Sequence, residues 1–374
     1  MLLLGLESSC DETAAAVVRD GVHVLSNVIA TQHELHEQYA GVVPEIASRA
    51  HLERVVPVVR ESLSCADVDL SQLDAIAVGH CPGLIGSLLV GVSAAKALAW
   101  SLGRPLIGVD HIHAHLHAGL LDAEPVSYPA LGLVVSGGHT SLFLLNDALD
   151  IQLLGRTIDD AIGEAYDKAA TILDLGYPGG PKLDALAQSG HDRAHDFPIS
   201  MLGPDTLDFS YSGLKTALLY AVHGQPERGR SHTRRTISLS DQERADFAAS
   251  FQRAAVTAVL RKLKRALKRY PVATILTGGG VTANSRLRHE LAELGRARNI
   301  DIRLPRIEYC LDNAAMIAGL AAARLSAGLC DDWTLSASPR SAIPSTGLTT
   351  IQISSRLRIS RLNCTRTPWR PMAR

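Results

Sequence analysis

Two stretches of the chain repeat one pattern, a short apolar strand followed by a small polar turn and a second strand. The first runs from Leu2 through a turn at 7–13 to Val18, and the second from Ala130 through a turn at 136–140 to Asn146. Such a repeat is typical of two related domains, and 374 residues are enough for two hydrophobic cores. Apolar helical periodicity alternates with further short apolar runs along the chain. The sequence therefore predicts an α/β protein built from two domains.

A third turn, at 277–284, is rich in glycine and follows the apolar run 273–276. A glycine-rich turn between a strand and a helix presents backbone N–H groups to a phosphate, although it can also be a plain tight turn. Three such turns predict a clamp around a nucleotide-like ligand. The pattern resembles the actin, sugar-kinase and Hsp70-like (ASKHA) superfamily, in which two α/β domains face each other across a ligand cleft. That superfamily lacks the G-x-x-x-x-G-K-[ST] loop, and so does this chain.

Four histidines occupy alternate positions between His111 and His117. On a helix, His111 and His115 project one turn apart from one face, and His113 and His117 do so from another, so either pair can grip a metal ion. A histidine-rich surface helix without metal is the alternative. A catalytic metal needs a third ligand, and the best distant candidate is Asp312. Its place before an alanine-rich segment favours a helix N-cap, a role that is compatible with metal binding.

Composition limits the other functions. A formal net charge of −1 gives no global attraction to nucleic acid or membranes, so RNA contacts must come from local basic patches. Six cysteines without a C-x-x-C pair predict reduced thiols in the cytoplasm. The apolar stretch 82–100 is expected to be a buried helix rather than a membrane span. Three basic segments can contact RNA or simply face water: Arg228, Arg230, Arg234 and Arg235; Arg261, Lys264, Arg265 and Lys268; and seven arginines after Trp333.

Seven segments, in order, resemble one family, the bacterial TsaD family of tRNA N6-adenosine threonylcarbamoyltransferases, whose members once carried the name glycoprotease. The resemblance covers roughly residues 1–344. The segments are 5–13 (GLESSCDET), 41–49 (GVVPEIASR), the histidine segment 111–117, 134–140 (VVSGGHT), 174–181 (DLGYPGGP), 209–216 (FSYSGLKT) and 312–318 (DNAAMIA).

The resemblance implies transfer of a threonylcarbamoyl group from threonylcarbamoyl-AMP to N6 of adenosine 37, in tRNAs that read codons beginning with A. The products are t6A and AMP. It also implies one divalent metal, Fe2+ or else Zn2+, held by His111, His115 and Asp312. His113 departs from the pattern, because bacterial relatives often carry Glu there, but it lies off the ligand face.

The resemblance also implies the substrate contacts. Backbone amides of Val134, Val135, Ser136, Gly137 and Gly138 would cradle the phosphate. Asp167 and Asp184 resemble the ribose and adenine contacts, with Gly180 and Asn284 completing the pocket. Without the resemblance, both aspartates are typical of a solvated helix face. Asp11 and Glu12, in the first turn, are candidates for accepting the amine proton, with a turn cap as the alternative. Lys215 is expected to brace a loop.

We expect four parts: 1–128 as a first α/β domain with the histidine helix, 129–325 as a second domain with the nucleotide clamp, 326–346 returning to the first domain, and 347–374 as an arginine-rich, disordered tail. The resemblance implies that a TsaB-type paralogue and a TsaE-type ATPase work with this chain and tRNA, away from membranes. The sequence leaves two alternative functions. A metalloprotease would want a Glu between His111 and His115, which the sequence lacks. A different carbamoyltransferase or ATPase of the same fold is the second.

Overall fold

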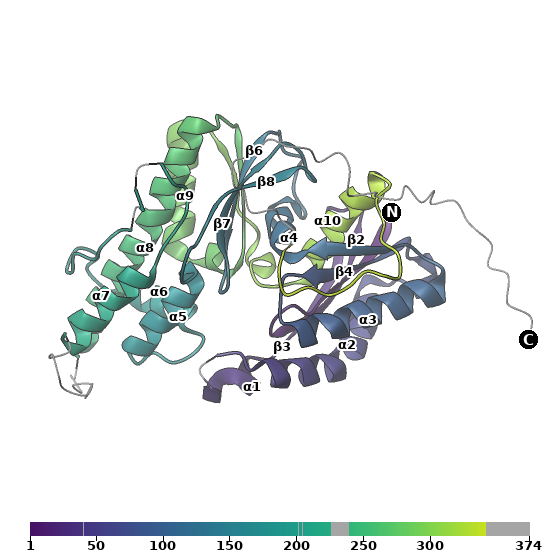
Figure 1. The fold of residues 1–374 in the computed structure, drawn as a ribbon, viewed down its shortest axis with the longest axis horizontal. Coiled ribbons are helices and arrows are strands. Elements are labelled where there is room, and N and C mark those ends of the chain that lie inside the picture. Colours follow the sequence, from purple (N-terminus) through teal and green to yellow (C-terminus); the bar gives the residue numbers. More distant parts are fainter. Residues whose placement is uncertain (40, 201, 204, 226–238, 342–374) are drawn as a thin grey trace, which may run out of the picture.

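The computed structural model describes residues 1–39, 41–200, 202–203, 205–225 and 239–341 (Figure 1). Its strands form two mixed five-stranded sheets. Sheet A has the order β3-β2-β1-β4-β5, and sheet B the order β10-β9-β6-β7-β8. The strands of sheet A are β1 (Leu2–Glu7), β2 (Glu12–Arg19), β3 (His23–Thr31), β4 (Ala75–Cys81) and β5 (Leu106–Asp110); those of sheet B are β6 (Ala130–Val135), β7 (Thr140–Leu145), β8 (Ile151–Arg156), β9 (Thr274–Gly278) and β10 (Asp301–Arg303).

The two sheets share one topology. In each, three strands form an antiparallel meander, β1-β2-β3 in sheet A and β6-β7-β8 in sheet B. The first strand of each meander then pairs in parallel with a later strand, β4 or β9. The predicted repeat of strand, polar turn and strand is thereby confirmed, and with it the two-sheet α/β fold class.

Both faces of sheet A are buried, because its central strands alternate between two cores. Leu3 and Ala14 point to one core, while Leu4 and Ala15 point to the other. Two long helices cover the second core, α2 (Pro44–Ala66) and α3 (Ile85–Leu102). Among the described residues, α3 is the one helix long and apolar enough to cross a membrane. This is weak evidence for a span, since Val92, Ala95 and Ala99 of α3 pack against sheet A.

The other face of sheet A is covered by α10 (Ala314–Ser326) and by α4 (His111–His117), the predicted histidine helix. Helix α10 lies close to the sheet because Gly5 has no side chain: a Cβ there would come within 2.9 Å of the Ala318 nitrogen. The sequence predicts that residues up to 325 belong to the second domain, but α10 shares its core with β1, β2, β4 and β5. The expected boundary at residue 325 is therefore wrong for α10, which packs with the first domain.

The sheet B core holds α5 (Ile162–Ile172), α6 (Gly179–Ala187), α7 (Ser212–His223), α8 (Asp241–Arg269) and α9 (Ser285–Arg298). The short helices are α1 (His33–His36), η1 (Glu37–Tyr39), η2 (Leu70–Gln72), η3 (Ala118–Leu120), η4 (Gly280–Ala283) and η5 (Ile307–Tyr309).

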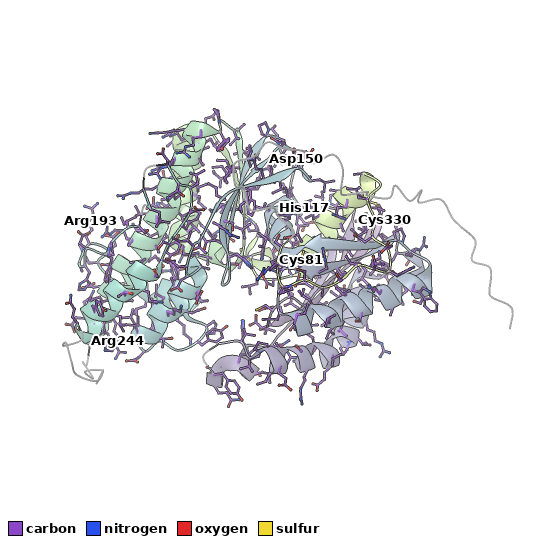
Figure 2. The ribbon with its side chains drawn as sticks, in the orientation of Figure 1. Cys81, His117, Asp150, Arg193, Arg244 and Cys330 are labelled. Carbon is purple, nitrogen blue, oxygen red and sulfur yellow. The ribbon has the colours of Figure 1, made fainter. Side chains whose placement is uncertain are left out.

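Helix α4 lies between the two sheets (Figure 2). Ala114 and Ala118 belong to the sheet A core, whereas Ile112 and Leu116 pack against β6, β7 and β9. The approach to sheet B is close, since a Cβ on Gly278, the last residue of β9, would stand 2.5 Å from the His115 carbonyl carbon. The histidines of α4 are therefore held where the two sheets meet.

Candidate active site and metal centre

The histidine helix starts at a fixed residue. Asp110, the last residue of β5, is its N-cap, and the Asp110 carboxylate accepts the N–H groups of Ile112 and His113. This cap sets the helical phase, so His111 and His115 project one turn apart from one face. Their ring centroids are 4.6 Å apart, and both residues are buried.

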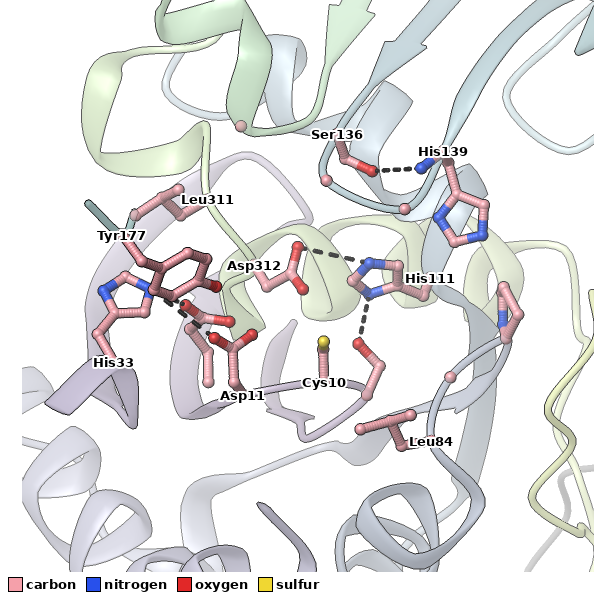
Figure 3. Close-up of a pocket in the computed structure, with 17 residues that line it drawn as sticks. Cys10, Asp11, His33, Leu84, His111, Ser136, His139, Tyr177, Leu311 and Asp312 are labelled. Atoms are coloured by element: carbon pink, nitrogen blue, oxygen red, sulfur yellow. Dashed lines mark hydrogen bonds and ion pairs between the residues drawn. The ribbon is translucent and has the colours of Figure 1, made fainter. Parts of the chain in front are cut away.

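Asp312 closes this group from the other end of the chain. Its Oδ1 lies 3.1 Å from His115 Nε2 and 3.5 Å from His111 Nε2. Asp312 is not the helix cap that the sequence also allowed: Asn313 caps α10, and its side chain accepts the N–H of Met316 at 3.0 Å. The Asp312 carboxylate faces His111, as Figure 3 shows, and also His115.

The three side chains fit a metal ion. One ligand atom from each lies within 4.8 Å of the others. His115 is fully buried, and its Nε2 faces the Asp312 carboxylate at 3.1 Å, whereas its Nδ1 has no hydrogen-bond partner among the described residues. A buried imidazole in that state is costly unless something else coordinates it. Two imidazoles and one carboxylate form a donor set that suits both Fe2+ and Zn2+.

The electrostatics of the group agree with this fit. Burial alone would raise the pKa of Asp312, but His111 and His115 hold that pKa well below its usual range. Burial would likewise lower the pKa of His111, and Asp312 with Glu7 instead raises it well above normal. The carboxylate is therefore ionised and draws positive charge toward itself, which a divalent cation can supply in place of a proton.

The other histidine pair is engaged elsewhere. His117 Nε2 lies 3.1 Å from the Gly21 carbonyl oxygen, and the His113 ring meets Phe143 edge-on with centroids 6.0 Å apart. Within the described part of the chain, no third ligand-type side chain joins this pair.

A pocket of about 300 Å3 opens beside the metal group (Figure 3). Its walls come from both sheets and from segments far apart in the sequence. They consist of Ser9, Cys10, Asp11, Glu12, His33, Pro82, Gly83, Leu84, His111, Ser136, Gly137, Gly138, His139, Tyr177, Gly280, Leu311 and Asp312. Of the predicted site residues, Asp11, Glu12, Ser136, Gly137, Gly138, His111 and Asp312 therefore share one cavity.

Two buried carboxylates form one side of this pocket. His33 Nε2 lies 3.4 Å from Glu12 Oε1 and 3.8 Å from Asp11 Oδ2. Burial raises the pKa of Glu12 well above the usual value, and the nearby charges of Asp312 and Asp11 add to the rise. A carboxylate with a raised pKa accepts a proton more readily near neutral pH, as a general base must.

The turn 136–138 forms the opposite side. Ser136 N–H donates to the His139 carbonyl at 2.8 Å, whereas the N–H groups of Gly137 and Gly138 donate to no described residue. Side chains at both glycines would meet nothing within 4 Å. The two N–H groups can therefore receive an anion. Val134 and Val135 lie inside β6, which is paired with β7 and β9, so their N–H groups belong to the sheet.

The remaining predicted contacts lie outside this pocket. Asp167 Oδ1 accepts the N–H of Gly179, next to Gly180. Asp184 and Asn284 are joined through Gln252, whose side chain donates to Asp184 at 3.0 Å and accepts from Asn284 at 2.9 Å. These residues link α5, α6, α8 and α9, and their role in substrate binding stays a prediction.

Sequence reasoning missed several residues of the site, and Glu7 and His139 are two of them. Glu7 Oε2 lies 3.1 Å from His111 Nδ1. Burial, together with the charges of His111 and His115, lowers the pKa of His139 to about 4. The segments 5–13 and 134–140 contain both residues, but neither spacing nor residue type indicates that a strand end and a turn meet at α4.

The basic segments are only partly described. Arg265 donates to the carbonyls of Gly203 and Thr206, so it anchors a loop. Arg261, Lys264 and Lys268 are exposed along α8. Arg228, Arg230, Arg234 and Arg235 and the tail 347–374 lie outside the described residues. Lys215 bonds to Asp160 at 2.8 Å, which agrees with its expected bracing role.

Comparison with known proteins gives consistent results. A family model described as tRNA N6-adenosine threonylcarbamoyltransferase matches residues 23–319. The curated enzyme of that name from Trichlorobacter lovleyi is 50% identical over 337 residues, covering 90% of this chain and 95% of the relative. The one from Salinibacter ruber is 48% identical over 339 residues, covering 91% of this chain and 99% of the relative.

Solved structures show the same fold at low sequence identity. Full-length HypF in its phosphate- and nucleotide-bound form gives a TM-score of 0.57 at 12% identity, covering 91% of this chain and 47% of that one. HypF from T. kodakarensis gives a TM-score of 0.56 at 16% identity, covering 87% and 48%. At these identities the likeness concerns the fold alone.

Proposed function

The chain belongs to the TsaD family of tRNA N6-adenosine threonylcarbamoyltransferases, and we propose that it transfers the threonylcarbamoyl group of threonylcarbamoyl-AMP to N6 of adenosine 37, forming t6A and releasing AMP. The substrates are tRNAs that read codons beginning with A. One observation carries the proposal: a single pocket holds two free glycine amides and two buried carboxylates, and it opens beside a group of three candidate metal ligands.

The reaction needs the parts that this pocket provides. The amine nitrogen forms a bond to the carbamoyl carbon, the bond from that carbon to the phosphate oxygen breaks, and AMP leaves with the electron pair. The N–H groups of Gly137 and Gly138 bind the phosphate and stabilise its charge as it departs. Glu12 takes the proton that the amine loses, with Asp11 as the neighbouring alternative. The cavity holds threonylcarbamoyl-AMP and the acceptor amine together. Much of the entropy lost in bringing them into contact is therefore lost on binding and not in the reaction step.

The proposed cofactor is one Fe2+ or Zn2+ held by His111, His115 and Asp312. When bound, such an ion supplies positive charge against phosphate and carbamoyl oxygens. The chain's own contribution is to keep the two imidazoles one helical turn apart and the carboxylate ionised.

The proposed partners are a TsaB-type paralogue, a TsaE-type ATPase and tRNA, in the cytoplasm. The exposed apolar side chains of α2 and α3 support pairing through the first domain. Leu52 and Val56 of α2 are 65% and 53% exposed, and Trp100 of α3 is 66% exposed. Apolar and aromatic side chains of this kind are enriched where proteins associate. The net charge of −1 supports shared capture of tRNA, because this chain alone offers little electrostatic attraction.

The test supplies threonylcarbamoyl-AMP, both partner proteins and an A-codon tRNA transcript, then digests the RNA to nucleosides for mass spectrometry. We expect threonylcarbamoyladenosine only when this chain is present, and little of it without the partners. A tRNA transcript with guanosine at position 37 is the matched control and should stay unmodified. Active partners that yield no product with this chain, alongside robust peptide hydrolysis by it, would overturn the proposal.

A further inference from the structure

Glu7 is a fully buried carboxylate at the end of β1. Its two oxygens have different partners: Oε1 accepts the N–H of Ser9 at 2.5 Å, and Oε2 lies 3.1 Å from His111 Nδ1. Among the described residues, His111 is the basic side chain that pairs with it. Burial of a carboxylate costs free energy unless its charge is balanced, and His111 is placed to balance the charge of Glu7.

The space around Glu7 is shaped for the carboxylate. A Cβ built on Gly79, in the adjacent strand β4, would stand 2.6 Å from Glu7 Oε2 and 3.4 Å from Ile317 Cδ1 of α10. Only a residue without a side chain leaves this oxygen free to reach His111. Strand β4, helix α10 and the Ser9 amide therefore hold the carboxylate in one place.

This contact selects the tautomer of His111. An ionised carboxylate only accepts hydrogen bonds, so His111 Nδ1 must carry the proton that they share. The lone pair of a neutral ring then lies on Nε2, the nitrogen 3.5 Å from Asp312. His115 has no corresponding carboxylate, because its Nδ1 has no hydrogen-bond partner among the described residues. The two histidines of the metal group are thus supported unequally.

We propose that Glu7 is a positioning residue of the metal centre, which fixes His111 as the tautomer that binds metal through Nε2 and balances the charge of the bound ion. The inference rests on the proposed metal site and extends it by one residue. Together, Glu7 and Asp312 carry two negative charges, which balance a divalent cation. Without Glu7, two neutral imidazoles and the single charge of Asp312 would hold the ion. A carboxylate behind a histidine ligand also makes the ring a stronger donor.

Substitution separates this role from simple packing. Glu7→Gln keeps the shape, but its single carbonyl can accept from only one of the two donors, Ser9 N–H and His111 Nδ1–H. We expect the full-length variant to bind Zn2+ about 10- to 100-fold more weakly than the unaltered protein, measured by competition with a chromophoric chelator. Ser9→Ala should cost less, because Ser9 Oγ, at 3.2 Å from the same nitrogen, is a neutral second acceptor.

The control variants distinguish failure of the proposed metal site from failure of the proposed role of Glu7. Glu61→Gln, an exposed change of the same kind on α2, should bind Zn2+ normally. His111→Ala and Asp312→Ala should lose Zn2+; if both bind it as the unaltered protein does, the metal site itself is misplaced. If both lose it while folded Glu7→Gln keeps full affinity, only the role of Glu7 is wrong.

A second measurement needs no variant of Glu7. Long-range 1H–15N spectra of the zinc-loaded protein, with the histidines labelled, report which ring nitrogen carries hydrogen. We expect His111 to be protonated on Nδ1 and zinc-bound on Nε2. A His111 ring protonated on Nε2 would refute the proposal even if Glu7→Gln failed to fold.

Discussion

At the scale of single residues, the metal group depends on which of four alternating histidines face Asp312. His111 and His115 do, whereas His113 and His117 contact Phe143 and Gly21. We predict that His111→Ala, His115→Ala and Asp312→Ala each lose bound metal and transferase activity while remaining folded. Metal content after purification in zinc-containing buffer, read beside circular dichroism, measures both.

The matched controls for this prediction are His113→Ala and His117→Ala, which remove an imidazole from the same helix. Both should retain metal. If these two variants are the ones that lose it, the ligand assignment is reversed.

A second prediction concerns the residues outside the pocket, Asp167 and Asn284. Either one changed to Ala should weaken binding of adenylate analogues by about 10-fold or more, since a buried polar partner is lost. Calorimetry with a non-hydrolysable adenylate measures this. Because Asn284 also caps α9 by accepting the Leu287 N–H, its variant must be checked for stability. Unchanged affinity in both variants would move the nucleotide elsewhere.

What the sequence could predict at this scale depends on local spacing. Helical geometry allows two histidine pairs, and only the family resemblance selects His111 and His115 with Asp312. The place of Asp312 before an alanine-rich helix favours a cap, but the cap is Asn313. Glu7 could not be found in this way. Its role arises only because β1 ends beside α4, a contact between positions more than 100 residues apart that no local pattern encodes.

At the scale of elements, the loop before α5 is fastened to α7. Asp159 accepts hydrogen bonds from Ser210, Tyr211 and Ser212, and Asp160 pairs with Lys168 and Lys215. Helix α5 then begins, and its Gly163 and Glu164 N–H groups donate to the carbonyls of Ser136 and Gly137. Lys215 thereby braces, through α5, the turn whose amides face the pocket.

The third prediction follows from this brace. Burial alone would raise the pKa of Asp160, but hydrogen bonds from Lys215 and Lys168 lower it. A carboxyl whose pKa is depressed on folding stabilises the protein above its unfolded pKa, near 4, and loses that contribution as pH falls through the folded pKa. Lys215→Met should therefore lower the free energy of unfolding by about 0.2–1 kcal/mol at pH 7 and by less at pH 3.

Urea unfolding at the two pH values measures this difference. Lys264→Met, an exposed change on α8, is the control and should show no such pH dependence. A loss of stability for Lys215→Met that is equal at pH 7 and pH 3 would show that the ion pair is not its cause.

The first two strands of each meander were predictable because short apolar runs and small polar turns are local signals. The partner of α10 was not. Its alanine-rich sequence packs well against either sheet, and the choice of sheet A rests on Gly5, whose missing side chain lets the helix approach. A glycine is visible in the sequence, but the helix that packs against it is not.

At the scale of the whole molecule, the tail 347–374 lies outside the described residues and holds most of the arginines that follow Trp333. The fourth prediction is that its removal leaves the chemistry intact but raises the tRNA concentration needed for half-maximal rate, because phosphate contacts from arginine add affinity. Initial rates at several tRNA concentrations and two salt concentrations measure this. Equal rates throughout would show that the tail takes no part in capture.

The metal group joins a helix from the first third of the chain to Asp312, near the end of the described residues, with Glu7 behind it. The ribosome incorporates Asp312 more than 300 residues after Glu7. At ordinary rates of synthesis, this interval lasts on the order of tens of seconds. A nascent or truncated chain that stops before Asp312 has the histidines without their carboxylate. We therefore expect retention of the proposed metal ion to require the chain through Asp312, and to distinguish such chains from shorter fragments that carry only the amino-terminal histidines.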